Sequence, residues 1–429
     1  MRRIGLILIL LSGGVSILWG FFLERSIDDG MLDFKVIYYG ERCLLQHHDP
    51  YQEGEPLRAY QADGNCPQLG AGLRDGLTWY LYLPPTLIFL APLAMLPWGS
   101  AHLLWMFLTA GSLILAALLT WDLAKDYSPG VSLFLICFVL ANSELLLATG
   151  NPAGIVVGFC VAGVWCIFKE RFIFAGVLCL ALSLAIKPHD AGLVWLFFLL
   201  AGGLYRKRAL QSLLFTVLLG LFGLIWVSQI SPHWMGELHS NLQALSAQGR
   251  NIDPRPTNPV YKSGPSMIIN LQSTLSAFWE DPRIYNPVSF LVCGALLLPW
   301  AVRTLRSKLS RPEIWLALAT VIPITMLVSY HRPYDAKLLL LTVPACAMLW
   351  AKDGPLRWIV LVINSAGIIL TQDIPLAILD LFSRGPRMRA TGLWGRILVD
   401  LLLRPTPLIL LLMGMIYLWV YLRREPERG

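Results

Sequence analysis

The chain has 429 residues, of which 56% are hydrophobic and only 14% are charged. A soluble domain carries about 25% charged residues, so the composition excludes an ordinary soluble enzyme. It predicts an all-α polytopic membrane protein, since helices satisfy their own backbone hydrogen bonds in lipid. The formal net charge is +7. The basic residues form short clusters between apolar segments, where they orient helices, so no nucleic acid is expected as a partner.

Apolar segments that approach the width of a bilayer recur along the whole chain. A membrane helix needs about 17 to 25 such residues, and no stretch is left over for a soluble catalytic domain. Residues 1–429 are therefore expected to form a single integral membrane domain. The candidate segments cover residues 4–23, 83–97, 101–121, 131–148, 152–168, 172–186, 190–205, 211–230, 286–302, 312–330, 336–350, 356–371 and 405–422.

The basic clusters between these segments predict the topology. Cytoplasmic ends of membrane helices carry an excess of lysine and arginine, which puts both termini inside and requires an even number of crossings. Segment 83–97 is short and rich in proline, which removes backbone donors, so we discount it and expect twelve crossings. Segment 4–23, which follows Met1-Arg2-Arg3, is expected to be an uncleaved first helix rather than a signal peptide.

This topology gathers polar residues in loops on the outer face. The long outer loops are residues 24–82, 231–285 and 372–404. Loops of such length usually carry function. In the first of them, the alternation of apolar and polar residues over 31–45 predicts a helix that lies on the membrane surface. Cys43 and Cys66 share that loop, and the sequence leaves open whether they form a disulfide or stay free.

Short polar clusters stand at the predicted outer ends of helices, while the motifs of common enzyme classes are missing. The chain has no P-loop, no H-E-x-x-H and no G-x-S-x-G, so ATPase, zinc protease and serine hydrolase activities lack their basic signals. The clusters are Asp33 with Lys35, His47-His48-Asp49-Pro50-Tyr51, Tyr82-Leu83-Pro84-Pro85, Gly150-Asn151-Pro152, Lys187-Pro188-His189-Asp190 and His331-Arg332-Pro333-Tyr334-Asp335.

The order of these clusters resembles glycosyltransferase family 87, which comprises bacterial polyprenol-phosphate-mannose-dependent transferases of the GT-C fold. The resemblance spans about residues 30–345. Two positions differ from the family pattern: Gln46-His47-His48 stands where a glycine is common, and Asn151 replaces the usual glutamine. The resemblance implies a GT-C type bundle of about 12 to 13 membrane segments with interfacial helices on the outer face.

A single base suffices for the reaction that this resemblance implies. A polyprenyl phosphate leaves as a stable anion without a general acid, so one base that takes the acceptor's hydroxyl proton is enough. Family members carry a catalytic aspartate just after the first helix, and Asp33 stands there. A helix cap is its structural alternative, and Asp28 or Asp29 is the alternative base. No cofactor or metal is expected, because His47 and His48 lack the spacing of metal ligands.

The remaining polar residues are candidates for binding the two substrates. Lys187, Arg332 and His331 are expected to bind the donor phosphate, since a cation at membrane depth needs a partner and guanidinium groups suit phosphate. Snorkelling of Lys187 and a satisfied interfacial histidine are the alternatives. Trp79 and Trp234 are candidate platforms for a sugar ring. Candidates for contact with sugar or acceptor are Asp49, Tyr51, Asn151, His189, Tyr334 and Asp335.

These observations predict a membrane glycosyltransferase on the outer face of the bacterial plasma membrane. We expect it to transfer a hexose, most simply mannose, from a polyprenyl-phosphate donor to a lipid or glycan acceptor, with inversion at C1 if one in-line displacement operates. Two alternatives stay open. One is a transporter or flippase of lipid-linked sugars, which favours repeated halves and polar residues near mid-membrane. The other is an O-antigen-ligase-like transferase with a diphosphate donor. The sequence does not fix the oligomeric state.

Overall fold

The computed structural model describes residues 2–27, 29–64, 69–250, 252–255, 268–375, 378, 394–395 and 404–424. Within these ranges the chain is helical and contains no strand. Each apolar segment predicted above is helical, and 7 helices are long and apolar enough to cross a membrane. The prediction of an all-α polytopic membrane protein is confirmed. Cys66 lies outside the described residues, so its pairing with Cys43 stays a prediction.

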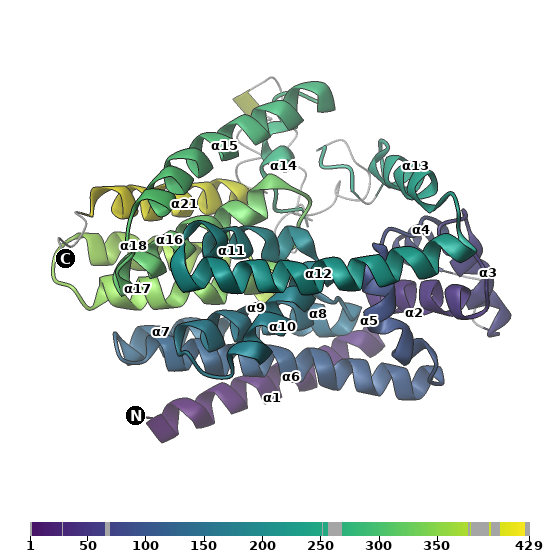
Figure 1. The fold of residues 1–429 in the computed structure, drawn as a ribbon, viewed down its shortest axis with the longest axis horizontal. Helices are drawn as coiled ribbons and strands as arrows, with labels where there is room; N and C mark the ends of the chain where they lie inside the picture. The colour runs from purple at the N-terminus through teal and green to yellow at the C-terminus, as the bar shows by residue number, and fades with distance from the viewer. Residues whose placement is uncertain are drawn as a thin grey trace.

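The bundle helices run roughly along the long axis of the molecule (Figure 1). Helices α12 and α15 expose leucine and phenylalanine side chains over much of their length, as expected for helices that face lipid. In chain order, the helices of the bundle are α1 (Arg2–Ser26), α5 (Pro84–Ala94), α6 (Trp98–Ala124), α7 (Pro129–Ala141), α8 (Glu144–Thr149), α9 (Ala153–Phe168), α10 (Ile173–Ile186), α11 (Pro188–Leu200), α12 (Gly203–Ile230), α15 (Pro282–Arg306), α16 (Arg311–Val328), α17 (Val343–Trp350), α18 (Leu356–Ile369) and α21 (Pro405–Arg423).

Both chain termini lie at the same end of the bundle (Figure 1). Basic side chains make polar contacts at that end. Lys169, after α9, pairs with Asp122 in the last turn of α6 at 3.0 Å. Arg303 of α15 donates a hydrogen bond to the Leu422 carbonyl near the end of α21 at 3.1 Å. This arrangement agrees with the predicted even number of crossings, and the number itself stays a prediction.

A group of short amphipathic helices closes the opposite end of the bundle (Figure 1). These cap helices are α2 (Leu32–Leu45), α3 (Glu55–Ala62), α4 (Ala71–Thr78) and α13 (Trp234–Ser246). The predicted surface helix over 31–45 corresponds to α2. Region 231–285, predicted above as a long outer loop, holds α13 and the short α14 (Leu271–Leu275). The Asn241 side chain of α13 donates to the carbonyls of Tyr51 and Tyr80 at 2.9 and 3.2 Å, which joins the two cap segments.

Helix α5 starts and ends near the cap. At its start, the Thr86 hydroxyl donates to the Ile186 carbonyl at the end of α10 at 3.3 Å. Just after its end, the Leu96 carbonyl accepts from the Tyr38 hydroxyl of α2 at 2.8 Å. With 11 residues it is about 16 Å long, well short of the bilayer core of about 30 Å. This geometry agrees with the prediction that segment 83–97 does not cross the membrane.

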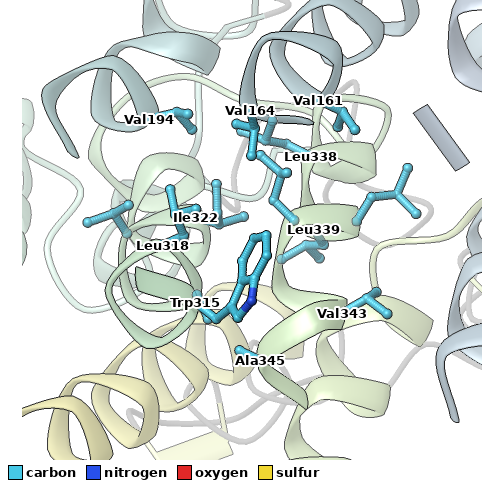
Figure 2. Close-up of a cluster of buried hydrophobic side chains, with 14 of the residues drawn as sticks. Val161, Val164, Val194, Trp315, Leu318, Ile322, Leu338, Leu339, Val343 and Ala345 are labelled. Atoms are coloured by element: carbon cyan, nitrogen blue, oxygen red, sulfur yellow. The ribbon is translucent and has the colours of Figure 1, made fainter. Parts of the chain in front are cut away.

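The apolar core lies where α16 packs against η2 (Asp335–Thr342) and α17 (Figure 2). Trp315 is buried there beside Leu339 and Ala345 (Figure 2). The sequence predicts one helix over 336–350, whereas the first 8 residues are a 3₁₀ helix and only the rest is α. Pro344 lacks the N–H that would bond to the preceding turn, which explains why the α-helical ladder starts only there. A 3₁₀ run of this length is uncommon.

A tight turn at Gly150 joins α2 to the bundle. The Met31 amide donates to the Ala148 carbonyl at 2.7 Å, and the Trp105 indole donates to the Gly150 carbonyl at 2.8 Å. Trp105 also stacks on Phe34 with ring centroids 4.6 Å apart. Gly150 has φ +65°, and a Cβ there would lie 2.8 Å from Cβ of Phe34. Only glycine fits this turn without strain, so the turn fixes the first residues of α2.

Replacement of Gly150 by alanine is expected to lower stability and to loosen α2. The left-handed conformation costs a residue with a Cβ about 1–2 kcal/mol, and the contact with Phe34 adds to that cost. Thermal unfolding of the purified protein measures the effect. Gly111→Ala in α6 is the matched control, because a Cβ at Gly111 meets nothing within 4 Å. Equal midpoints for both variants would contradict the proposed constraint.

Candidate functional site

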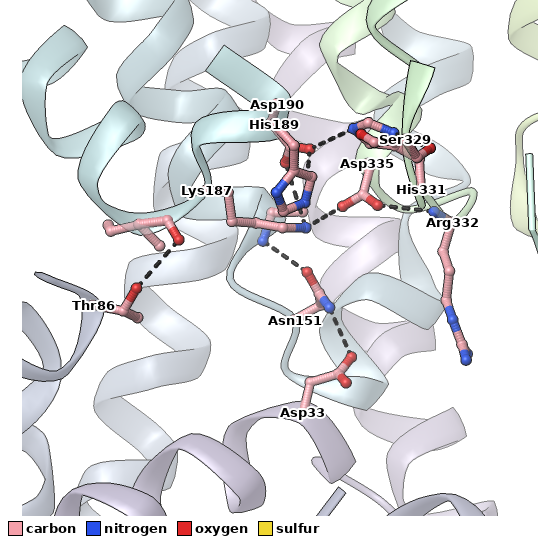
Figure 3. Close-up of polar contacts among 12 residues, drawn as sticks. Asp33, Thr86, Asn151, Lys187, His189, Asp190, Ser329, His331, Arg332 and Asp335 are labelled. Atoms are coloured by element: carbon pink, nitrogen blue, oxygen red, sulfur yellow. Dashed lines mark hydrogen bonds and ion pairs between the residues drawn. The ribbon is translucent and has the colours of Figure 1, made fainter. Parts of the chain in front are cut away.

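A buried ammonium group lies at the cap end of the bundle, in the break between α10 and α11. The Lys187 side chain is almost fully enclosed, with 8% of its surface exposed. Its Nζ forms an ion pair with Oδ1 of Asp335 and lies 3.4 Å from Oδ2 of Asp190 (Figure 3). Both carboxylates are buried. Burial opposes the charge, but the two carboxylates outweigh it and raise the pKa of Lys187.

The two carboxylates have further partners from the segment between α16 and η2. Nε2 of His331 lies 3.1 Å from Oδ1 of Asp190, and the backbone amide of Arg332 donates to Oδ2 of Asp335 at 2.8 Å (Figure 3). Nδ1 of His331 lies 3.0 Å from the Ser329 carbonyl, which can only accept, so Nδ1 carries the hydrogen. Burial opposes a second proton, but Asp190 outweighs it and raises the pKa of His331.

Asp33, in the first turn of α2, faces this ion cluster from the other side. Its Oδ2 accepts a hydrogen bond from the Asn151 side chain at 2.8 Å, and Oδ1 of Asn151 accepts from the Ala153 amide at 2.9 Å (Figure 3). The second bond fixes the orientation of the Asn151 amide. Burial raises the pKa of Asp33, while the Asn151 hydrogen bond and the charges of Arg332 and Lys187 lower it only in part. The carboxyl is therefore more basic than an exposed aspartate.

Aromatic side chains lie beside Lys187 and Arg332. Nζ of Lys187 lies 5.7 Å from the centroid of the Tyr334 ring. The side chain of Arg332 leads away from Asp335 (Figure 3), and its Nε donates to the Tyr330 hydroxyl. Cations, carboxylates and phenols from segments far apart in the sequence thus surround one region at the base of the cap. Such a set can hold an anionic group next to a base.

The structure brings most of the predicted site residues together and separates two of them. His189 joins the group through its ring, whose centroid lies 5.1 Å from that of His331. Asp49 and Tyr51 lie in the cap instead. The Tyr51 amide donates to Asp49 at 2.9 Å, and the Tyr51 hydroxyl donates to the Tyr82 carbonyl at 2.7 Å. These two residues therefore organise the cap, and within the described ranges neither makes a hydrogen bond or ion pair with the ion cluster.

The alternative base Asp29 and the candidate sugar platforms Trp79 and Trp234 make contacts that hold the cap together. Asp29 accepts a hydrogen bond from the Gly70 amide at 3.1 Å, which ties the turn between α1 and α2 to the residue before α4. Asp28 lies outside the described residues. The guanidinium of Arg250 lies 4.7 Å from the Trp79 ring, and Trp234 packs on Tyr51 with centroids 6.0 Å apart. Both tryptophans thus contact protein groups within the cap.

Three potential metal ligands meet at the ion cluster. Among the described residues, His189, Asp190 and His331 offer ligand atoms that all lie within 4.8 Å of one another. The Lys187 ammonium, however, lies 3.4 Å from Asp190 and would repel a divalent cation at the same carboxylate. The charges therefore favour Lys187 and His331 as the partners of Asp190. His48, considered above for a metal, instead lies 2.8 Å from Glu55.

Asp190 belongs to the site although its sequence context predicts no role for it. It stands in the Lys187-Pro188-His189-Asp190 cluster and joins Lys187 and His331. A useful signal was its position three residues after Lys187, because helical residues at that spacing lie on one face. An aspartate in the first turn of an apolar helix is also costly unless it has a partner.

A second buried polar cluster holds η2 from its far side. Nζ of Lys337 donates to the Asn142 carbonyl at 2.6 Å and to Oε1 of Gln372 at 2.7 Å. It also lies 3.6 Å from Asp373, which accepts from the Leu145 amide at 2.7 Å. Lys337 is fully buried and stands two residues after Asp335. This cluster therefore fixes the helix that presents Asp335 to Lys187.

Comparison with known families matches the chain to the model of glycosyltransferase family 87 over residues 80–330. The match covers more than half of the chain and includes Asn151, Lys187 and Asp190. No match was found among curated proteins or among solved structures. The family match agrees with the resemblance carried by the polar clusters, and the helices supply the membrane character. The chain is therefore a membrane glycosyltransferase that belongs to glycosyltransferase family 87.

Proposed function

We propose that this glycosyltransferase transfers a hexose, most simply mannose, from a polyprenyl-phosphate donor to a lipid or glycan acceptor on the extracytoplasmic face of the bacterial plasma membrane. One observation carries the proposal. Asp33, a carboxylate with a raised pKa, lies at the same end of the bundle as the basic side chains of Lys187, His331 and Arg332. A phosphate-linked sugar needs both parts and no second acid.

In the proposed reaction the acceptor hydroxyl attacks C1 of the sugar. The bond between C1 and the phosphate oxygen breaks, and the polyprenyl phosphate leaves with the electron pair. The proton of the acceptor passes to the Asp33 carboxylate, whose raised pKa suits a general base. A single in-line displacement of this kind inverts the configuration at C1.

The cations have distinct proposed roles in binding the leaving phosphate. Lys187 is already paired with Asp190 and Asp335, so its charge offsets part of their negative charge and weakens their repulsion of the donor. Arg332 extends beyond the cluster, and a guanidinium can bind two phosphate oxygens at once. His331 lies next to Asp190, which raises the pKa of the imidazole and favours its protonated form. His189, Tyr334 and Asn151 line the same region and are proposed to contact the sugar.

The cap is proposed to receive the acceptor. Asp49 and Tyr51 belong to it and are therefore assigned to the acceptor side rather than to the donor sugar. A lipid donor would reach the ion cluster from between the bundle helices. The transporter alternative is less well supported, because the ion cluster of Lys187, Asp190 and Asp335 lies in the break between α10 and α11, and the residues give no sign of the repeated halves that transporters tend to show.

Replacement of Asp33 by asparagine is expected to reduce transfer by about 10²- to 10⁴-fold, the usual contribution of a general base. The assay uses purified protein in lipid nanodiscs, a panel of radiolabelled polyprenyl-phosphate hexoses and membrane lipid extract as acceptor. Asp29→Asn is the matched control, because Asp29 holds Gly70 instead of facing Lys187.

Equal transfer by wild type and Asp33→Asn would remove Asp33 as the base.

The same assay tests the proposal that no metal takes part. With EDTA present, activity is expected to stay within about twofold, because Lys187 occupies the charge position beside Asp190. A loss that added Mg²⁺ or Mn²⁺ restores would assign His189, Asp190 and His331 to a metal.

Replacement of Asn151 by alanine is expected to change the pH dependence of transfer. The amide of Asn151 stabilises the ionised form of Asp33, so its removal raises the pKa of Asp33 further. The acid limb of kcat/KM then moves to higher pH, with about tenfold lower activity on that limb in addition to any loss of the plateau that a missing sugar contact causes. Asn364→Ala is the control, since this buried asparagine bonds to Tyr417 instead. An unshifted limb would contradict the role of Asp33.

The proposed orientation predicts that a reporter at Gly64, in the cap, is extracytoplasmic, whereas a reporter at Lys308, between α15 and α16, is cytoplasmic. Gly64 follows α3, and Lys308 lies in a basic cluster. Paired alkaline phosphatase and green fluorescent protein fusions measure both positions in cells. A cytoplasmic signal at Gly64 would move the site to the inner face.

A further inference from the structure

A hollow opens on the exposed surface of α12, next to its first turn. Its volume is about 470 Å³. It lies far from the cap, because α12 starts toward the end of the bundle that holds both termini (Figure 1). A Cβ at Gly203 would meet nothing within 4 Å, so this side of the first turn is open. The hollow is lined by Gly203, Arg206, Lys207, Leu210, Gln211 and Leu214.

Three consecutive cations stand at this hollow. Arg206 and Lys207 line it and are exposed. Nε of Arg206 donates to the Leu199 carbonyl at 3.0 Å, which holds the guanidinium in place. Arg208 reaches the edge of the hollow, because its Nη1 donates to Oε1 of Gln211 at 2.8 Å. None of the three cations forms an ion pair with a carboxylate in the described part of the chain.

The carboxylates at this end of the bundle serve other groups. Glu313 pairs with Arg303 of α15 at 3.0 Å. The charge of Glu170 acts on Tyr205, next to the cations in sequence. The Tyr205 ring, however, packs on Phe168 of α9, and Tyr205 lies on the opposite side of α12 from the hollow by helical spacing. The positive charge at the hollow is therefore left for a group from outside the chain.

A row of exposed apolar side chains continues from the hollow along α12. Its members recur every three or four residues, so they lie on one face of the helix. The row extends about 22 Å along the helix axis, which exceeds half of the bilayer core of about 30 Å. Charge at one end and an apolar row below it are the two parts of a lipid site. The row consists of Leu210, Leu214, Val217, Leu218, Leu221 and Ile225.

We propose that this face of α12 binds an anionic phospholipid, with the lipid phosphate at Arg206, Lys207 and Arg208 and an acyl chain along the apolar row. A guanidinium can bind two phosphate oxygens, and basic side chains at the membrane surface attract anionic lipids. Basic residues between membrane helices also orient those helices, but orientation requires neither a hollow nor an apolar row aligned with it. The inference is independent of the proposed transfer reaction.

A bound lipid is expected to stabilise the turn between α11 and α12. Arg206 already joins the two helices through the Leu199 carbonyl, and a phosphate on its guanidinium would hold this bond in place. A ligand that binds only the folded state raises the unfolding midpoint. Added phosphatidylglycerol should therefore raise the midpoint of the wild type, whereas phosphatidylcholine should not.

The test measures lipid binding by native mass spectrometry of the purified protein in detergent. The probes are phosphatidylglycerol and phosphatidylcholine with the same acyl chains. The double variant Arg206→Gln/Lys207→Gln is expected to raise the Kd for phosphatidylglycerol about 30-fold, since each surface cation contributes about fivefold. Gln211→Glu keeps every cation and the Leu199 bond but puts a carboxylate into the hollow, and it should raise this Kd about fivefold.

The matched control is Arg306→Gln/Lys308→Gln, which removes the same charge from exposed positions at the end of α15. Its Kd for phosphatidylglycerol should stay within about twofold of wild type. An equal loss in both double variants would show that overall charge attracts the lipid and would overturn the site. Equal Kd values of wild type for the two lipids, or equally tight binding of free glycerol phosphate, would also overturn it. No sugar donor is present, so failure of the transfer reaction would not affect these outcomes.

Discussion

The arrangement of this molecule depends on the need to compensate one buried ammonium group. Lys187 sits where an apolar chain can hold a charge only with partners, and these come from two other positions, Asp190 and Asp335. Removal of one partner from such a pair typically costs about 3–5 kcal/mol. The break between α10 and α11, the loop after α16 and the start of η2 are thereby held together at one point.

The proposed base reaches this point by a different route. Asp33 is brought there by backbone bonds and ring stacking around Gly150, not by charge. The site thus has a rigid cationic half in the bundle and a carboxylate half that belongs to the cap. Asn151 is the one side chain in the described site whose hydrogen bonds join Asp33 to the start of α9. A transferase that binds two substrates benefits from such a division, because each half can be held by a separate scaffold.

The sequence predicts the class of the fold well, since apolar length and basic clusters follow directly from the bilayer. The family resemblance pointed to Asp33, and the position of polar residues at the ends of apolar segments pointed to Lys187, His331 and Asp335; the structure brings these residues together, and their roles stay predictions. The separation of Asp49 and Tyr51 from the ion cluster was not predictable, because it depends on how the cap folds back through Asn241.

The 3₁₀ form of η2 has a mechanical consequence. A 3₁₀ helix rises about 2.0 Å per residue and an α-helix about 1.5 Å, so the 8 residues of η2 extend about 4 Å farther than they would in α form. Lys337 and its partners hold this overwound segment in the core. Asp335 is the first residue of this extended segment. The winding of η2 therefore sets how far Asp335 reaches from the core toward Lys187.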